Sequence, residues 1–139
     1  MDTYNLDRFV MAQEPVIDRV RAELRRGRKE SHWMWFVFPQ IAGLGHSDMA
    51  RHYTIGSIDE AAAYLAHPVL GPRLVDCTRL VNAIEGKTVG QIFGTPDDMK
   101  FRSSMTLFAH VPAAGPEFAA ALVTYFAGAE DAATLRKLL

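Results

Sequence analysis

Apolar residues recur every three to four positions along most of the chain, which is the spacing of a buried α-helix face. Near the N-terminus this pattern predicts a first helix, with Asn5 as its candidate N-cap. A second helix follows and is separated from the first by Pro15, because proline lacks the amide hydrogen and clashes with the preceding turn. We expect the break near residues 13–14 and the end of the second helix at Gly27. The inward positions are Leu6, Phe9 and Val10, then Val16, Ile17, Val20 and Leu24.

The most apolar stretch runs from His32 to Gln40 and contains both tryptophans. Nearly every position is apolar, so periodicity does not separate helix from strand. Aromatic content favours a strand, but the chain offers no good partner strand. We therefore predict a short buried helix that ends before Pro39, because proline disfavours helical geometry in the residue before it. Trp35 is expected in the core, where large aromatic side chains contribute most.

Capping residues predict the remaining helices. Ser47, Ser57, Thr88 and Asp131 each stand where an N-cap is expected. Thr95 is expected to cap the strongest helix start in the chain, because a proline and two aspartates follow it. With no alternating strand pattern, the sequence predicts an all-α fold, a single compact orthogonal bundle of about seven or eight short helices, and one domain over residues 1–139.

Charge and composition narrow the class of partner. The formal net charge is −1 and the pI about 6.5, so nothing favours nucleic acid or an anionic membrane as partner. The longest apolar run is too short to span a bilayer, and the N-terminus does not resemble a signal peptide. Cys77 is the single cysteine, which excludes an internal disulfide. We expect a cytoplasmic protein, and its oligomeric state stays open.

Five strings in this chain are uncommon: SHWMWFVFPQ at 31–40, GLG at 43–45, YLAHPVLGPRL at 64–74, IFG at 92–94 and KFRSSMTLF at 100–108. They resemble the bacterial domain-of-unknown-function-1810 family. The resemblance covers nearly the whole chain and implies a small helical bacterial protein without an established activity. Members are sometimes labelled calpastatin, but no feature of this sequence supports calpain inhibition.

A remoter resemblance is to the YbiA-like NADAR superfamily, whose members act on ADP-ribose-type or nucleotide-derived N-glycosides. It rests on Glu60 and Ala61 ahead of Gly71 and Arg73, followed by a lysine-bearing helix. The catalytic glutamate of that superfamily cannot be assigned to a residue here.

The densest polar cluster on a predicted helix is formed by Lys100, Ser103 and Ser104. Residues three and four apart share a helix face, so these side chains can converge. A lysine with two hydroxyls suits a phosphate or carboxylate. The alternative is that Asp98 pairs with Arg102 across one turn while the serines bond back to their own helix.

Three further places are candidates for a binding site. His32 and Trp33, with Trp35, could stack on a planar ring, although core packing is the alternative. Gln40 follows the apolar run, where an amide can read a hydrogen-bonding edge of a ligand. Ser47 ends a glycine-containing loop before a helix N-terminus, where free amide groups attract anions, and a plain turn and cap is the alternative.

Metal and cofactor sites are not expected. No histidines pair at the spacing of a zinc-binding helix, and no nucleophile–base order is recognisable. Cys77 lies in an apolar helix, where a thiol is usually inert. The basic run at residues 25–29 is most simply a solvated helix end, although together with Lys100 it could bind an anion.

Two functions remain. One is a binding site for a phosphate-bearing nucleotide or ADP-ribose-like small molecule, with N-glycoside hydrolysis as a further possibility. The alternative is a non-catalytic module that binds a protein or an effector. A pocket that joins Gln40 to Lys100 would favour the first, and a flat apolar patch would favour the second.

Overall fold

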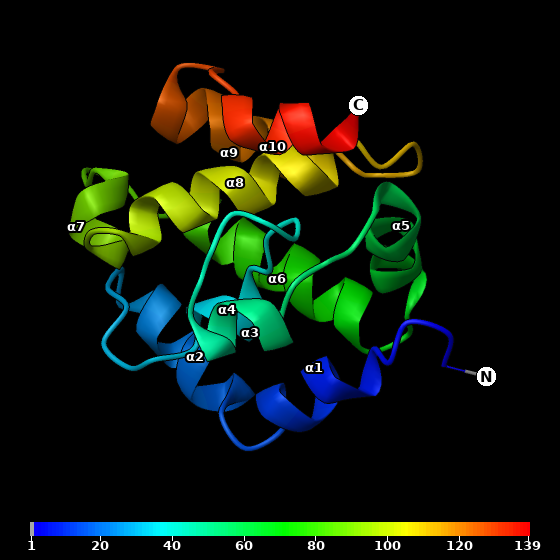
Figure 1. The fold of residues 1–139 in the computed structure, drawn as a ribbon. Helices are drawn as coiled ribbons and strands as arrows, with labels where there is room; N and C mark the ends of the chain where they lie inside the picture. The colour runs from blue at the N-terminus through cyan, green and yellow to red at the C-terminus, as the bar shows by residue number, and fades with distance from the viewer. Residues whose placement is uncertain (1) are drawn as a thin grey trace.

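The computed structural model describes residues 2–139 and is all-helical in this range (Figure 1). Its helices are α1 (Asp7–Gln13), α2 (Ile17–Arg25), α3 (Met34–Val37), α4 (Asp48–His52), α5 (Ile58–Ala66), α6 (Leu70–Asn82), α7 (Val89–Phe93), α8 (Asp97–Ala109), α9 (Glu117–Phe126) and α10 (Ala132–Leu138). An isolated bridge joins Ile41 and Ile55. The all-α class is confirmed. The count exceeds the expected seven or eight, because α3, α4 and α7 are only four or five residues long.

Proline and glycine set the first boundaries as the sequence predicts. Helix α1 ends at Gln13, and α2 begins two residues after Pro15. Gly27 follows α2 with φ +79°, a left-handed conformation that glycine adopts without steric cost. The aromatic run forms the short helix α3, which ends before Pro39. These predictions are confirmed because each depends on local backbone geometry.

Most of the predicted caps are also confirmed. The side chains of Ser47, Ser57, Thr88 and Asp131 accept hydrogen bonds from the backbone of α4, α5, α7 and α10. At Thr88 the capping box is complete, since the Gln91 side chain accepts from the Thr88 amide. These bonds satisfy amide groups that have no partner inside their own helices.

Two predicted caps are wrong. Helix α8 begins at Asp97 with Pro96 as its N-cap and no side-chain cap, so Thr95 lies one residue too early. The carboxylate of Asp98 accepts the Met99 amide instead, at 2.8 Å. Asn5 does not cap α1 either. The carboxylate of Asp2 accepts the amides of Leu6 and Asp7 at 2.7 and 2.9 Å.

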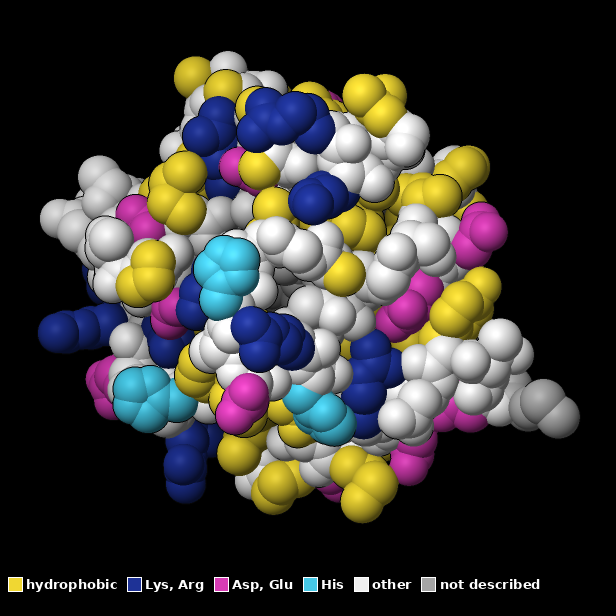
Figure 2. All heavy atoms as spheres, viewed as in Figure 1, with side chains coloured by type: hydrophobic (Ala, Val, Ile, Leu, Met, Phe, Trp, Pro, Cys, Tyr) yellow, Lys and Arg dark blue, Asp and Glu magenta, His cyan; other side chains and the backbone are white. Residues whose placement is uncertain are grey.

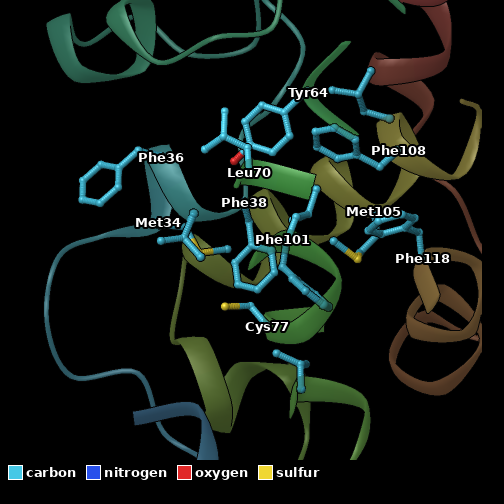
Figure 3. Close-up of a cluster of buried hydrophobic side chains, with 14 of the residues drawn as sticks. Met34, Phe36, Phe38, Tyr64, Leu70, Cys77, Phe101, Met105, Phe108 and Phe118 are labelled. Carbon is cyan, nitrogen blue, oxygen red and sulfur yellow. The ribbon is translucent and has the colours of Figure 1, made fainter. Parts of the chain in front are cut away.

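Helix α8 crosses the molecule and packs against α9 and α10 above it and against α7 and α5 near its two ends (Figure 1). Aromatic side chains meet along its inner face. The ring of Phe38 makes edge-to-face contacts with Phe93 and Phe101 at centroid distances of 5.8 and 5.1 Å. Figure 3 shows Phe101, Met105 and Phe108 from α8 within this cluster, beside Leu70 and Cys77 from α6. The core therefore brings α3, α6, α7 and α8 together.

The two tryptophans have different environments. Trp33 is 1% exposed, and its indole N–H donates to Glu23 at 3.0 Å. Trp35 is only partly buried, so the expectation that it fills a core position is wrong. Within residues 2–139 no helix has the length and apolarity needed to cross a membrane.

A close approach between α5 and α6 explains why a glycine stands at position 71. A Cβ atom at Gly71 would lie 2.1 Å from the carbonyl oxygen of Leu65. His67 accepts hydrogen bonds through Nδ1 from the amides of Val69 and Leu70, at 3.1 and 3.2 Å. The histidine thus caps the turn that leads into α6, and only glycine fits where the two helices meet.

Candidate functional site

A pocket of about 460 Å³ lies between α8, α4, the loop before α4 and the start of α10. The surface is visibly hollowed between α4 and α8 on the face shown in Figure 2, so the site is open rather than enclosed. Its lining combines apolar, polar and charged side chains. They are Trp35, Gln40, Leu44, Gly45, His46, Ser47, Ala50, Pro96, Met99, Lys100, Ser103, Asp131 and Ala133.

Lys100 supplies the positive charge of the pocket. Its Nζ atom lies 5.1 Å from the centroid of the Trp35 ring, a distance at which the aromatic face attracts a cation. The same atom lies 3.4 Å from Oδ1 of Asp97, one turn earlier on α8. The Lys100 side chain is 25% exposed, so its ammonium group remains accessible to a ligand.

Asp97 is shared between two lysines. Its Oδ2 atom lies 2.9 Å from Nζ of Lys29, whose side chain is 8% exposed. One carboxylate thus faces two ammonium groups. The basic run therefore does meet Lys100, through Lys29. The adjacent Arg25, Arg26 and Arg28 do not line this pocket.

The structure brings together two of the three predicted cluster residues on α8. Lys100 and Ser103 both line the pocket, and the Ser103 hydroxyl donates to the Met99 carbonyl at 3.1 Å. This bond leaves the lone pairs of Ser103 Oγ free to accept. Ser104 is fully buried and lies outside the pocket lining. One position further along a helix turns a side chain by about 100°, which separates Ser104 from its neighbour.

The alternative explanation of the cluster predicts an ion pair between Asp98 and Arg102, which is wrong. It also predicts that the serines bond back to their own helix, which is right for Ser103 only. Arg102 does not pair with Asp98, because its guanidinium donates to the carbonyls of Ala129 and Glu130 at 2.9 and 3.1 Å. Ser103 does bond back to its own helix. Arg102 therefore holds the chain before α10 against α8, which places the start of α10 at the pocket.

Gln40 and Ser47 reach the pocket from either end of one loop. Glycine allows this loop to close: Gly43 has φ +95°, and a Cβ atom at Gly45 would lie 2.6 Å from that of Ala50. The Gln40 carbonyl accepts from the Ile55 amide at 2.9 Å, which fixes the backbone while the side-chain amide lines the pocket. Ser47 accepts the Ala50 amide at 3.1 Å.

His32 and Trp33 do not line the pocket. His32 is exposed, and Trp33 is buried against Glu23. Sequence reasoning missed the pocket roles of His46 and Asp131, and it grouped Trp35 with His32 and Trp33 as a possible stacking surface. Side chains two positions apart in a helical turn point about 200° apart, which is why Trp35 reaches the pocket and Trp33 does not.

Among the described residues that line the pocket, Asp131 supplies the one carboxylate. Its Oδ2 atom accepts from the amide and hydroxyl of Thr134 at 2.9 and 2.6 Å, so this oxygen caps α10. The Asp131 amide donates to Thr106 on α8 at 2.9 Å. Oδ1 takes no part in these bonds and is available as an acceptor.

Glu23 lies outside the pocket but holds the segment that leads into it. Burial alone would raise the pKa of Glu23, but four hydrogen bonds outweigh it and lower the pKa to about 2. They come from the Ser31 hydroxyl, the amides of Ser31 and Glu30, and the Trp33 indole. The carboxylate therefore stays ionised and fixes the chain ahead of α3.

Other reactive groups contribute no site. Burial raises the pKa of the Cys77 thiol to about 12, so the thiolate form that reacts is suppressed. Within residues 2–139, no three His, Cys, Asp or Glu side chains are grouped so that they could hold a metal ion.

The fold and the pocket define a small all-helical protein with a composite surface site. The chain belongs to the family described as "Protein of unknown function (DUF1810)", whose model matches residues 3–138. It is similar to the conserved hypothetical protein Rv1873 from Mycobacterium tuberculosis, whose crystal structure gives a TM-score of 0.97 at 54% identity. That alignment covers 99% of this chain and 98% of the other. No curated protein matches the chain.

Proposed function

We propose that this protein binds a small phosphate-bearing molecule, of the nucleotide or ADP-ribose type, in the pocket between α4, α8 and α10. The observation that carries the proposal is the position of Lys100. Its ammonium group lies in the same pocket as Trp35, Gln40 and Ser103, and its carboxylate partner is shared with Lys29. A phosphate would form charge-assisted hydrogen bonds with Lys100.

The other lining residues fit the rest of such a ligand. Gln40 offers both a donor and an acceptor to the edge of a base. Ser103 Oγ would accept a hydrogen bond from a ribose hydroxyl. Trp35 and Met99 supply apolar surface for a planar ring. The volume of about 460 Å³ lies in the usual range for small-molecule sites.

N-glycoside hydrolysis, which the remoter resemblance suggests, would need a carboxylate near the scissile bond. In this pocket Asp131 would take a proton from water while the water oxygen bonds to the anomeric carbon. The carbon–nitrogen bond would break, and the leaving nitrogen would keep the electron pair and take up the proton that Asp131 had accepted. Asp131→Asn tests this step well because asparagine is also a good N-cap. Retained binding with lost base release would support it, and unchanged release would exclude Asp131.

The binding proposal is tested by a thermal-shift screen with NAD, ADP-ribose and nucleotides, followed by calorimetric titration of each hit. A ligand at a hundred times its dissociation constant raises the stability by about 2.7 kcal/mol. Lys100→Ala should abolish binding and leave the melting temperature nearly unchanged, because exposed ion pairs contribute at most about 1 kcal/mol. Ser103→Ala should weaken binding less.

Two matched variants control this experiment. Arg19→Ala removes an exposed cationic side chain that does not line the pocket, and Ser104→Ala removes the buried neighbouring serine. Neither should change the affinity. Equal affinity in wild type and Lys100→Ala would remove Lys100 from the site. A screen in which no compound raises the melting temperature would contradict the proposal and favour the alternative, a module that binds a protein or an effector.

A further inference from the structure

A second hollowed surface surrounds Gly27, where α2 ends against the loop after α6. It consists of two adjoining hollows of about 410 and 580 Å³ that share Lys87. We call it the Gly27 groove and define it by its lining residues. They are Leu24, Arg25, Arg26, Gly27, Arg28, Leu80, Ala83, Ile84, Glu85, Gly86, Lys87, Gly90 and Gln91.

The groove is strongly basic in a chain whose net charge is −1. Four cationic side chains line it against a single carboxylate, that of Glu85. Arg26 lies 3.6 Å from Glu30, but Arg25 and Arg28 are exposed and take part in none of the ion pairs found within residues 2–139. These two guanidinium groups are therefore available to an external anion.

Lys87 has a structural role in the same place. Its Nζ atom donates to the Gly27 carbonyl at 3.0 Å, at the negative end of the α2 dipole. Gly27 has φ +79°, and a Cβ atom there would lie 2.9 Å from this ammonium group. The contact ties α2 to the loop after α6.

One wall of the groove is apolar. Leu80, Ala83 and Ile84 present one face of the end of α6, and Leu24 is buried beneath them. Leu80 and Ile84 are partly exposed, although both pack against the core. The surface thus offers an apolar strip about one helical turn long with arginines beside it.

We propose that the Gly27 groove docks an acidic amphipathic peptide segment of a partner protein. Carboxylates of the peptide would pair with Arg25 and Arg28, since arginine binds carboxylates through two parallel hydrogen bonds. An apolar side chain of the peptide would cover Leu80 and Ile84. A nucleic acid fits less well, because no aromatic side chain lines the groove for base stacking. A membrane fits less well, because the apolar strip is only about one helical turn long.

The proposal is tested by fluorescence anisotropy with a labelled peptide of alternating glutamate and leucine. The double variant Arg25→Glu/Arg28→Glu should weaken binding by at least about tenfold, since opposite charges become like charges. Leu80→Ser should weaken it as well. The matched control is Arg19→Glu/Arg136→Glu, which reverses two exposed arginines outside the groove. Circular dichroism melting checks that each variant is folded.

Several results would overturn the proposal. An equal loss of affinity in the Arg19→Glu/Arg136→Glu control would show that the peptide is attracted by the overall charge of the protein and not by the groove. Equal binding of a glutamate–serine peptide would show that the apolar strip makes no contact. Stronger binding of an oligouridylate, or of vesicles with anionic lipid, at the same ionic strength would assign the groove to another class of partner. Retained affinity in Arg25→Glu/Arg28→Glu would place the peptide elsewhere.

Discussion

At the scale of single residues, the fold depends on buried polar groups whose hydrogen bonds come from distant parts of the chain. Glu23 on α2 is 2% exposed and accepts four hydrogen bonds from residues 30–33. Gln13 on α1 donates to the Phe36 carbonyl at 2.6 Å and to the Tyr64 hydroxyl at 3.1 Å. Each of these polar side chains fixes the aromatic run from one side, which apolar packing alone would not do.

Glu23→Gln should destabilise the protein by about 2 kcal/mol at neutral pH, because an amide cannot accept four hydrogen bonds and carries no charge. The pKa of Glu23 is lowered from its ordinary 4.5 to about 2, so its stabilising contribution is complete above pH 4.5 and is lost as the pH falls toward 2. Denaturant melts of both proteins across this range check the prediction. A difference in stability that stays constant down to pH 2 would contradict it.

Trp33→Ala should cost about 3–5 kcal/mol, because it empties a fully buried position and leaves Glu23 without its indole donor. Trp35→Ala should cost about half as much, because that side chain is only partly buried. The same substitution removes the ring beside Lys100 and should weaken ligand binding. Chemical denaturation of both variants compares the two positions, and a larger loss for Trp35→Ala would refute the assignment of Trp33 to the core.

At the scale of the element, the sequence predicts helix ends wherever a local rule decides them. The caps at Ser47, Ser57, Thr88 and Asp131 follow from one side chain and the turn after it, so they are readable without tertiary structure. Thr95 matches the same rule but is not used, because α8 starts two residues later. The capping rule depends on residue type alone. The direction in which the chain leaves α7 also decides where α8 begins, and the rule does not describe it.

Gly71→Ala tests the closest approach between two elements. The added Cβ would lie 2.1 Å from a backbone oxygen on α5, so the helices would have to separate. We expect a loss of about 3 kcal/mol or more. Gly90→Ala is the matched control, because Gly90 is also the second residue of its helix and has no atom nearer than 3.9 Å.

The control variant should be neutral or more stable by about 0.5–1 kcal/mol, since alanine restricts the unfolded chain more than glycine does. Melting temperatures of the two variants give the comparison. Similar stabilities would mean that α5 and α6 adjust to the extra methyl group at little cost.

At the scale of the whole molecule, the pocket combines residues that are far apart in the sequence. Local reasoning selected Lys100 and Ser103 because they share a helix face, Gln40 because it follows the apolar run, and Ser47 because it precedes a helix N-terminus. It missed Asp131, which looks like an ordinary cap, and it named Lys29 only within a basic run that could act with Lys100. Their positions depend on how α10 and the chain after α2 pack against α8, and no local pattern encodes that packing.

Asp97→Asn should change stability and ligand affinity in opposite directions. The carboxylate neutralises Lys29, whose side chain is 8% exposed, so its loss leaves a nearly buried ammonium group unpaired and should cost about 2–3 kcal/mol. The same loss frees Lys100 from its neighbour at 3.4 Å. We therefore expect a phosphate-bearing ligand found in the thermal-shift screen to bind about fivefold more tightly, which corresponds to about 1 kcal/mol.

Asp98→Asn is the matched control, because Asp98 is the adjacent acid on α8 and takes part in no ion pair found within the described residues. It should change the affinity little. Calorimetric titration and denaturant melts of both variants separate the two effects. If Asp97→Asn weakened binding, Asp97 would belong to the ligand-binding surface itself, and it would no longer be the group that competes with the ligand for Lys100.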